Sequence, residues 1–183
     1  IREVNIINLC YFVFIFAFSG MEFTLTFLAQ ERLAYKAMDN AYMFIYIGLL
    51  LTLIQGGFVR RYAHQIGEKK LATFGMAIIL PGLLIISMAY SSLSLYAGLT
   101  FLAIGSALII PTLTSLVSLL SPENVQGEAM GIFRSLGSLG RVLGPFIVSI
   151  VYWRFSSQSA YYFGSIIILI TFVTLLKLKI QKN

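Results

Sequence analysis

Three ionisable side chains inside apolar runs are the residues of this sequence that could do chemistry. Glu22 lies within the first run, and Arg134 and Arg141 lie within the fifth. A charge inside a bilayer costs about 2.5 kcal/mol or more, so such residues face a polar cavity or one another and mark pathways. A carboxylate in such a cavity can take up a proton, and a guanidinium can answer a negative charge. We therefore expect a pathway for a polar solute or a proton.

The spacing in the fifth run separates two faces of one helix. Arg134 and Arg141 are seven residues apart, which is two helical turns, so they share a face with Ser138 between them. The neighbouring face, on which another helix can approach closely, carries Gly137, Gly140 and Gly144, followed by Pro145. For Arg134 we favour a position near the cytoplasmic interface, where its side chain reaches out to the headgroups. For Arg141, deep in the run, we favour a cavity.

Glu22 is the natural counterpart of Arg141. The two levels in the bilayer differ by about four residues, or about 6 Å, which two long side chains can span. We expect a proton-carrying carboxylate, with two alternatives: a fixed structural salt bridge, or a helix end already in water. A weaker polar face, which either lines a cavity or bonds to a neighbouring helix, carries Gly48, Thr52 and Gln55.

The composition indicates how these residues are held. The chain has 183 residues, of which 58% are hydrophobic and 11% are charged, whereas soluble domains are about a quarter charged. A membrane-spanning helix needs about 20 mainly apolar residues. Six runs qualify, and they leave no room for a soluble domain. We predict an all-α membrane protein, one six-helix bundle over 1–183, with spans at 5–28, 42–59, 71–90, 93–120, 127–153 and 160–176.

Basic residues gather at the ends of the apolar runs and predict the orientation. Eight lie at the amino end, between the second and third runs and in the tail: Arg2, Arg60, Arg61, Lys69, Lys70, Lys177, Lys179 and Lys182. The opposite loops hold three, namely Arg32, Lys36 and Arg154. The positive-inside rule therefore places both ends of this chain in the cytoplasm. It also accounts for the net charge of +6 without a nucleic-acid partner.

The sequence carries no arrangement typical of an enzyme or a cofactor site. Its single histidine, His64, lies among basic residues, where we expect it to be exposed and without chemistry. We expect no metal site, because a second histidine is missing, and no other cofactor. No phosphate-binding loop is visible, so we do not expect direct use of ATP.

The stretch 55–71 resembles the basic loop between the eighth and ninth helices of drug:proton antiporters of the major facilitator superfamily. Gly57, Arg61, Gly67, Lys69 and Lys70 match that loop. The acidic residue of the loop's first-half counterpart is absent, and the spacing to Gly67 is longer, so its gating ion pair is not carried over. The candidate gating residues are Gly57, Arg60, Arg61, Gly67, Lys69 and Lys70.

A second resemblance covers the later helices. The stretch 111–127, with the Gly144-Pro145 pair, is similar to the tenth and eleventh helices of tetracycline-efflux-type transporters. There a Gln-Gly pair, here Gln126-Gly127, opens helix eleven. Together with 18–27, the pattern looks most like the animal tetracycline-transporter-like proteins. The resemblance implies helices seven to twelve, the carboxyl-terminal half of a major facilitator fold with two inverted three-helix repeats.

The function that follows is secondary active transport by alternating access, in which this half rocks against an amino-terminal six-helix half. We expect proton-coupled exchange or efflux of a small amphipathic organic solute, and an organic anion in view of Arg141. Glu22 would take the proton. The alternative is a non-transporting membrane scaffold or chaperone on the same fold, which predicts no solute flux and indifference to Arg141→Ala. Either protein is a multi-pass integral membrane protein with the lipid bilayer as partner.

Overall fold

Every regular element of the computed structural model is helical over residues 2–179, which are the residues that the structure describes. The elements are α1 (Arg2–Leu33), α2 (Ala37–Leu53), η1 (Ile54–Val59), α3 (Arg60–Ile66), α4 (Glu68–Ser87), α5 (Ser92–Leu120), α6 (Gln126–Arg154) and α7 (Ser157–Lys177). Because α2, η1 and α3 are continuous, the described residues form six helical segments long and apolar enough to cross a membrane. The predicted all-α, six-helix class is confirmed. Lys182 lies outside the described residues.

The helices differ from the apolar runs mainly at their ends. The first run was expected over 5–28, but α1 continues to Leu33, so Arg32 lies in its last turn and not in a loop. Arg154 is likewise the last residue of α6. The third run was expected to reach residue 90, but α4 ends at Ser87. Helices α1 and α6 extend beyond the hydrocarbon core because the long side chains of Arg32 and Arg154 can reach the headgroup region.

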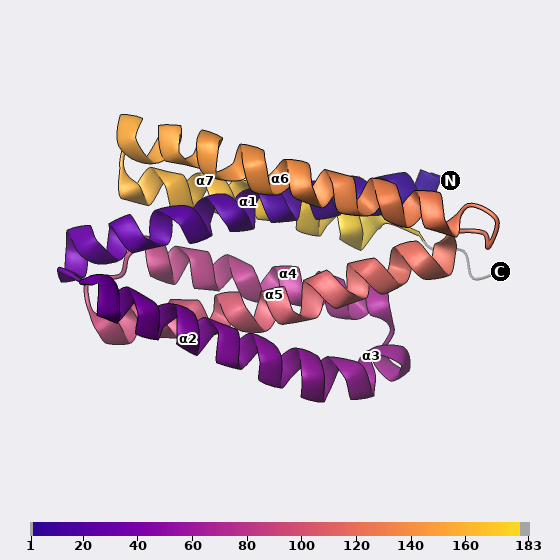
Figure 1. Cartoon of the computed structure of the whole chain (residues 1–183), viewed down its shortest axis with the longest axis horizontal. Coiled ribbons are helices and arrows are strands. Elements are labelled where there is room, and N and C mark those ends of the chain that lie inside the picture. Colours follow the sequence, from indigo (N-terminus) through magenta and orange to yellow (C-terminus); the bar gives the residue numbers. More distant parts are fainter. Residues whose placement is uncertain (1, 180–183) are drawn as a thin grey trace.

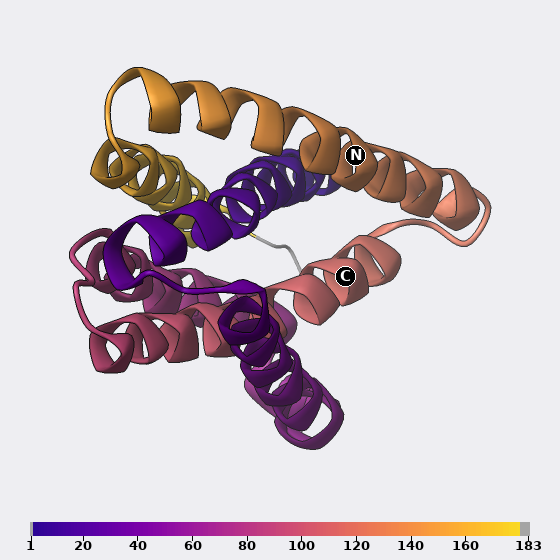
Figure 2. The same ribbon diagram turned by 60° about the vertical axis from the view of Figure 1, so that its left-hand side comes forward.

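The helices alternate in direction. Two successive triplets of helices pack against each other in related ways. Helix α1 packs against α6 and α7, and α5 packs against α2 and α4. Exchanging the triplet α1–α2–α4 with α5–α6–α7 maps the first set of pairs onto the second, as expected for an inverted repeat. In Figure 1, α4 and α7 lie behind the other four helices, and they contact each other. Figure 2 shows how far α2 and α6 diverge on either side of α1.

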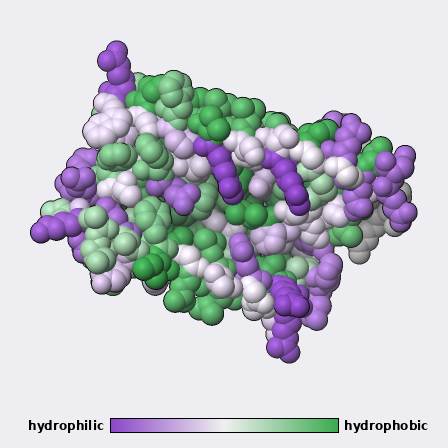
Figure 3. Space-filling view, in the orientation of Figure 1, coloured by the Kyte–Doolittle hydropathy of each residue, from purple (hydrophilic) through white to green (hydrophobic). Residues whose placement is uncertain are grey.

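The two ends of the bundle are polar and its sides are apolar. Figure 1 places the amino end, α3, the α5–α6 turn and the end of α7 together, opposite the other three turns. Figure 3 shows hydrophilic side chains at both ends, hydrophobic surface between them, and a further group of hydrophilic side chains in the middle of the face. That middle group interrupts the apolar surface over the region between α6 and α2.

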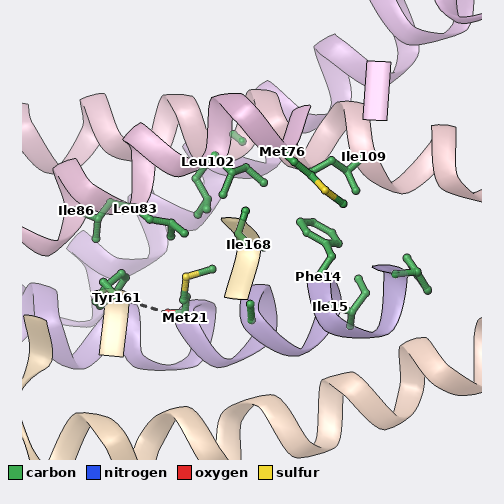
Figure 4. Close-up of a cluster of buried hydrophobic side chains, with 14 of the residues drawn as sticks. Phe14, Ile15, Met21, Met76, Leu83, Ile86, Leu102, Ile109, Tyr161 and Ile168 are labelled. Atoms are coloured by element: carbon green, nitrogen blue, oxygen red, sulfur yellow. Dashed lines mark hydrogen bonds between the residues drawn. The ribbon is translucent and has the colours of Figure 1, made fainter. Parts of the chain in front are cut away.

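The core lies where α1, α4, α5 and α7 meet. Figure 4 shows a cluster of its buried side chains, which include Phe14, Met76, Leu102 and Ile168. By contrast, α2 buries only Met43 and Ile47 against the rest of the described chain. Only 28% of an 18-residue apolar stretch of α6 is buried, compared with 56% of such a stretch in α1 and in α5. The segment containing α2 and the helix α6 are therefore the two membrane-spanning segments least covered by the rest of the described chain.

Candidate functional site

A cavity of about 690 Å³, the central cavity, lies between α1, α2 with η1, α5 and α6. It brings together three of the predicted pathway residues, Glu22 from α1, Gln55 from η1 and Arg141 from α6. Its full lining is Ile15, Phe18, Ser19, Glu22, Phe23, Thr26, Phe27, Phe44, Leu51, Gln55, Ser106, Ile110, Arg141 and Pro145. The volume falls within the range of about 300–1,000 Å³ usual for small-molecule sites.

The central cavity offers hydroxyl oxygens mainly as acceptors. Ser106 donates its hydroxyl to the Leu102 carbonyl oxygen at 2.7 Å, and Thr26 donates to that of Phe23 at 3.3 Å. Ser19 donates across the helix contact to the Gly140 carbonyl oxygen at 3.3 Å. Because these hydroxyl protons are engaged, the strong donors of the cavity wall are the guanidinium of Arg141 and the side-chain amide of Gln55. Ser106 was not predicted, because serine is too common in membrane helices to stand out, whereas the helical spacing does place Ser19 and Thr26 on one face with Glu22.

Glu22 and Arg141 share the cavity without forming an ion pair. No nitrogen of Arg141 lies within 4.0 Å of a carboxylate oxygen of Glu22 in the described structure. Both side chains are exposed, so water or a solute in the cavity can reach them. The fixed salt bridge that was one alternative is therefore not formed. The carboxylate remains free to take up a proton, and the guanidinium remains free to bind an anion.

Glycines set the relative depth of these two side chains. At the crossing of α1 and α6, a Cβ atom added to Gly144 would overlap the Phe16 carbonyl oxygen, and one added to Gly140 would lie 3.0 Å from the Phe12 carbonyl oxygen. On α1, a Cβ atom on Gly20 would lie 2.7 Å from the carbonyl oxygen of Gly144. The two backbones therefore touch, and Glu22 and Arg141 leave the crossing on the same side.

The remaining members of the expected packing face take different positions. A Cβ atom on Gly137 would lie 2.6 Å from the ring of Tyr11, which stacks on Phe133 with ring centroids 3.8 Å apart. Gly137 thus accommodates an aromatic ring rather than a backbone. Pro145 lines the central cavity.

Gln55 reaches the cavity from a π-helical turn. The backbone N–H of Arg60 donates to the carbonyl of Gln55, five residues earlier, where an α-helix would use the fourth. Such turns insert one extra residue and often occur at functional sites. Gln55 was expected on an ordinary helix face with Gly48 and Thr52. The Gly56-Gly57 pair, weak in helix propensity, was the available signal for the irregular turn.

Arg134 and Ser138 lie outside the central cavity. Both are exposed on α6, and Ser138 donates its hydroxyl to the carbonyl oxygen of Arg134 at 3.1 Å. The seven-residue spacing does place both arginines on one helix, but the cavity extends only as far as Arg141. Arg134 lies nearer the end of the bundle where α1 begins and α7 ends.

The predicted basic loop is mostly helical. Gly57 belongs to η1, Arg60 and Arg61 begin α3, and Lys69 and Lys70 lie in the first turn of α4. Gly67 alone separates the two helices, with φ of +95°, in a region that favours glycine. In a helix, the backbone N–H and C=O groups of this segment bond to one another. An open loop at the membrane edge would depend on water for these hydrogen bonds.

Two contacts fasten this segment to the bundle. The Lys69 ammonium donates to the Leu176 carbonyl oxygen at the end of α7, at 3.1 Å. Glu68 lies 3.1 Å from the Nδ1 atom of His64 and accepts a 3.4 Å bond from Ser115 of α5. Glu68 is an acidic residue whose part in this segment the sequence analysis did not anticipate. His64 is exposed as expected, with 82% of its side chain accessible, although it has Glu68 as a partner.

A polar network at the opposite end of the bundle was also missed. Arg32 donates to the Ser87 carbonyl oxygen at 2.7 Å, to that of Ala89 at 3.2 Å and to the Ser157 hydroxyl at 2.9 Å. Beside it, Glu31 accepts a 2.6 Å bond from the Tyr152 hydroxyl. This outer network joins the ends of α1, α4, α6 and α7. The adjacent pair Glu31 and Arg32, at the end of the first apolar run, was the sequence feature that could have indicated this network.

Comparison with known proteins identifies the architecture. The family model described as Major Facilitator Superfamily matches residues 9–182. The chain is 37% identical over 179 residues to the Major facilitator superfamily domain-containing protein 10 of Mus musculus, covering 98% of this chain and 39% of that protein. It is 27% identical over 123 residues to the class E tetracycline resistance protein of Escherichia coli, covering 67% and 30%.

A solved structure extends the comparison to three dimensions. The crystal structure of the human organic anion transporter MFSD10 (TETRAN) superposes with a TM-score of 0.91 at 33% identity, covering 95% of this chain and 41% of that one. The chain spans about two fifths of the length of these relatives. The family match over nearly the whole chain, the six apolar helices and the shared fold show that this chain is a multi-pass membrane protein and belongs to the Major Facilitator Superfamily.

Proposed function

We propose that this chain is the carboxyl-terminal six-helix half of a secondary transporter that moves an amphipathic organic anion in a proton-coupled manner by alternating access. Both chain ends are cytoplasmic in this proposal, and an amino-terminal half closes the central cavity from the opposite side. The observation that carries the proposal is the shared, water-accessible cavity of Glu22 and Arg141, in which the two charges are not paired.

The lining of the cavity supports an amphipathic anion. Arg141 and Gln55 supply donors for an anionic group, and the aromatic rings of Phe18, Phe23 and Phe44 supply apolar wall. A relative with 33% identity over 95% of this chain is an organic anion transporter by name. The similarity to a tetracycline resistance protein supports the drug:proton branch of the family.

The charges that line the cavity support proton coupling. An ionised Glu22 repels an anion at Arg141, and a protonated Glu22 does not, so the proton and the anion strengthen each other's binding. This linkage favours movement of the proton and the anion in the same direction. The resemblance to drug:proton antiporters implies opposite directions. Flux measured under imposed pH gradients of either sign separates the two.

The experiment that tests transport uses the full-length protein in liposomes. Uptake of organic anions is compared for the unaltered protein, Arg141→Ala and Arg134→Ala. Because Arg141 lines the cavity and Arg134 does not, we expect Arg141→Ala to abolish anion flux and Arg134→Ala to retain it. The two variants remove the same charge from the same helix, so a general effect of charge on folding would affect both.

The scaffold or chaperone alternative makes the opposite prediction. It expects no flux of any tested anion from the unaltered, correctly inserted protein, and no dependence of any cellular effect on Arg141. Equal flux in the unaltered protein and Arg141→Ala would likewise contradict an anion site at Arg141.

A further inference from the structure

A second pocket, the side lobe, lies between α1 and α6 next to the central cavity. It has a volume of about 660 Å³ and is lined chiefly by Phe23, Phe27, Phe146, Ile150 and Trp153. Phe23, Phe27 and Pro145 line both the side lobe and the central cavity, so the two spaces share a wall. The charged groups Glu22 and Arg141 line only the central cavity. The side lobe is lined mainly by apolar side chains, and its one charged lining residue is Arg154, the last residue of α6.

The walls of the side lobe are held by contacts among their aromatic rings. The ring centroids of Phe27 and Trp153 lie 5.6 Å apart in an edge-to-face arrangement, and those of Phe23 and Phe27 also lie 5.6 Å apart. Trp153 makes a second edge-to-face contact with Tyr152, whose hydroxyl is anchored on Glu31. These contacts fix the orientation of Trp153 before any solute arrives, which lowers the ordering cost of binding.

The chain itself leaves this aromatic surface uncovered. Phe146 is 67% exposed and Trp153 is 68% exposed. One polar atom of the wall is also unsatisfied, because the Ser149 hydroxyl is shielded from solvent without a hydrogen-bond partner among the described residues. An occupant with an apolar body and one polar substituent fits these features.

We infer that the side lobe holds the apolar body of the same organic anion whose charged group lies at Arg141. This inference rests on the proposed function and assigns it a second subsite, with Trp153 and Phe146 as specificity-determining residues. The shared wall at Phe23, Phe27 and Pro145 connects the subsites, so one molecule can occupy both. Anions with a bulky apolar body should therefore bind more tightly than compact anions.

The test compares two probe anions on the full-length protein in detergent. Adamantane-1-carboxylate carries a bulky apolar body, and acetate carries none. Loss of one large aromatic ring from an apolar contact weakens binding about tenfold or more. We expect Trp153→Ala to raise the Kd of adamantane-1-carboxylate by that factor in isothermal titration calorimetry, while acetate binding stays unchanged. The matched control is Ile170→Ala, on the exposed side of α7 and outside both pockets.

Fluorescence gives a second readout at the lobe itself. Trp153 is the single tryptophan of this chain. The difference between the emission of the unaltered protein and that of Trp153→Phe isolates its signal within the full-length protein. We expect adamantane-1-carboxylate to shift this emission and acetate to leave it unchanged.

The outcomes separate this inference from the proposed function. Unchanged adamantane-1-carboxylate affinity in Trp153→Ala would contradict the assignment of the side lobe as a subsite. An equal loss of affinity for both anions, together with a lower melting temperature, would also contradict it. The side lobe would then be a surface that packs against the other half of the protein. If Arg141→Ala bound both anions normally while Trp153→Ala lost only the bulky one, the proposed anion site would fail and the lobe would stand.

Discussion

Glu22 on α1 and Arg141 on α6 line one cavity beside the closest crossing of their helices, yet their charged groups are more than 4.0 Å apart. The crossing is fixed by touching backbones at Gly20, Gly140 and Gly144. The separation leaves one negative and one positive group available in the same space. A transporter needs such availability, because a charge already neutralised by its neighbour has little left for a solute.

The crossing predicts a strong effect of a single methyl group. A Cβ atom on Gly144 would overlap the Phe16 carbonyl oxygen, so Gly144→Ala must push α1 and α6 apart. We expect a loss of about 1–3 kcal/mol in the free energy of unfolding. The measurement is thermal unfolding of the full-length protein in detergent.

Gly131 on the same helix is the matched control for Gly144. A Cβ atom there would meet nothing within 4 Å. Gly131→Ala should therefore be neutral or stabilise the helix by about 0.5–1 kcal/mol, through the lower backbone entropy of alanine in the unfolded state. Equal melting temperatures of the Gly144 and Gly131 variants would contradict the close crossing.

The outer network predicts that Arg32 stabilises the bundle. Arg32 is half-buried and donates to two carbonyl oxygens at the end of α4 and to Ser157. We expect Arg32→Met to cost about 2–3 kcal/mol of unfolding free energy, because the accepting groups lose a charged donor. Lys36→Met removes an exposed charge from the neighbouring turn and should leave the melting temperature within a degree or so. A smaller effect of Arg32→Met than of Lys36→Met would exclude the network as a stabilising element.

The backbone conformation of Gly67, between α3 and α4, predicts that a side chain at this position is destabilising. Its φ of +95° and ψ of 130° lie in a region that residues with a Cβ atom rarely adopt. We expect Gly67→Ala to destabilise the α3–α4 junction by about 1–3 kcal/mol. Faster proteolysis at the junction is the readout. Gly48→Ala, at an exposed position with open space around it, is the control and should be cleaved no faster than the unaltered protein.

The sequence predicted the helices and the central charges because their signals are local. An acidic residue or an arginine deep in an apolar run needs no tertiary information to stand out, and Glu22, Arg141 and Gln55 do meet in one cavity. Arg134 shows the limit of that reasoning. Its spacing from Arg141 gives the same face of the helix, but the extent of the cavity depends on how α1, α2, α5 and α6 are arranged around it.

Other features depend on hydrogen bonds that the hydropathy pattern does not reveal. Ser106 is an acceptor in the cavity because its proton is engaged by Leu102. Arg32 reaches carbonyl oxygens more than fifty positions away in the chain. The π-helical turn at Gln55 replaces an α-helical hydrogen-bond pattern that helical periodicity assumes. Only the assembled bundle brings Arg32 to the carbonyl oxygens of Ser87 and Ala89.

The pH dependence of anion affinity in Glu22→Gln tests the central claim most directly. In liposomes containing the full-length protein, lowering the pH should lower the KM for the anion, because protonation of Glu22 removes a repulsive charge beside Arg141. Glutamine resembles the protonated carboxyl group, so Glu22→Gln should hold the low KM across the whole pH series. Glu128→Gln, in the exposed first turn of α6, should keep the dependence of the unaltered protein. An unchanged pH dependence in Glu22→Gln, at normal expression, would contradict the account.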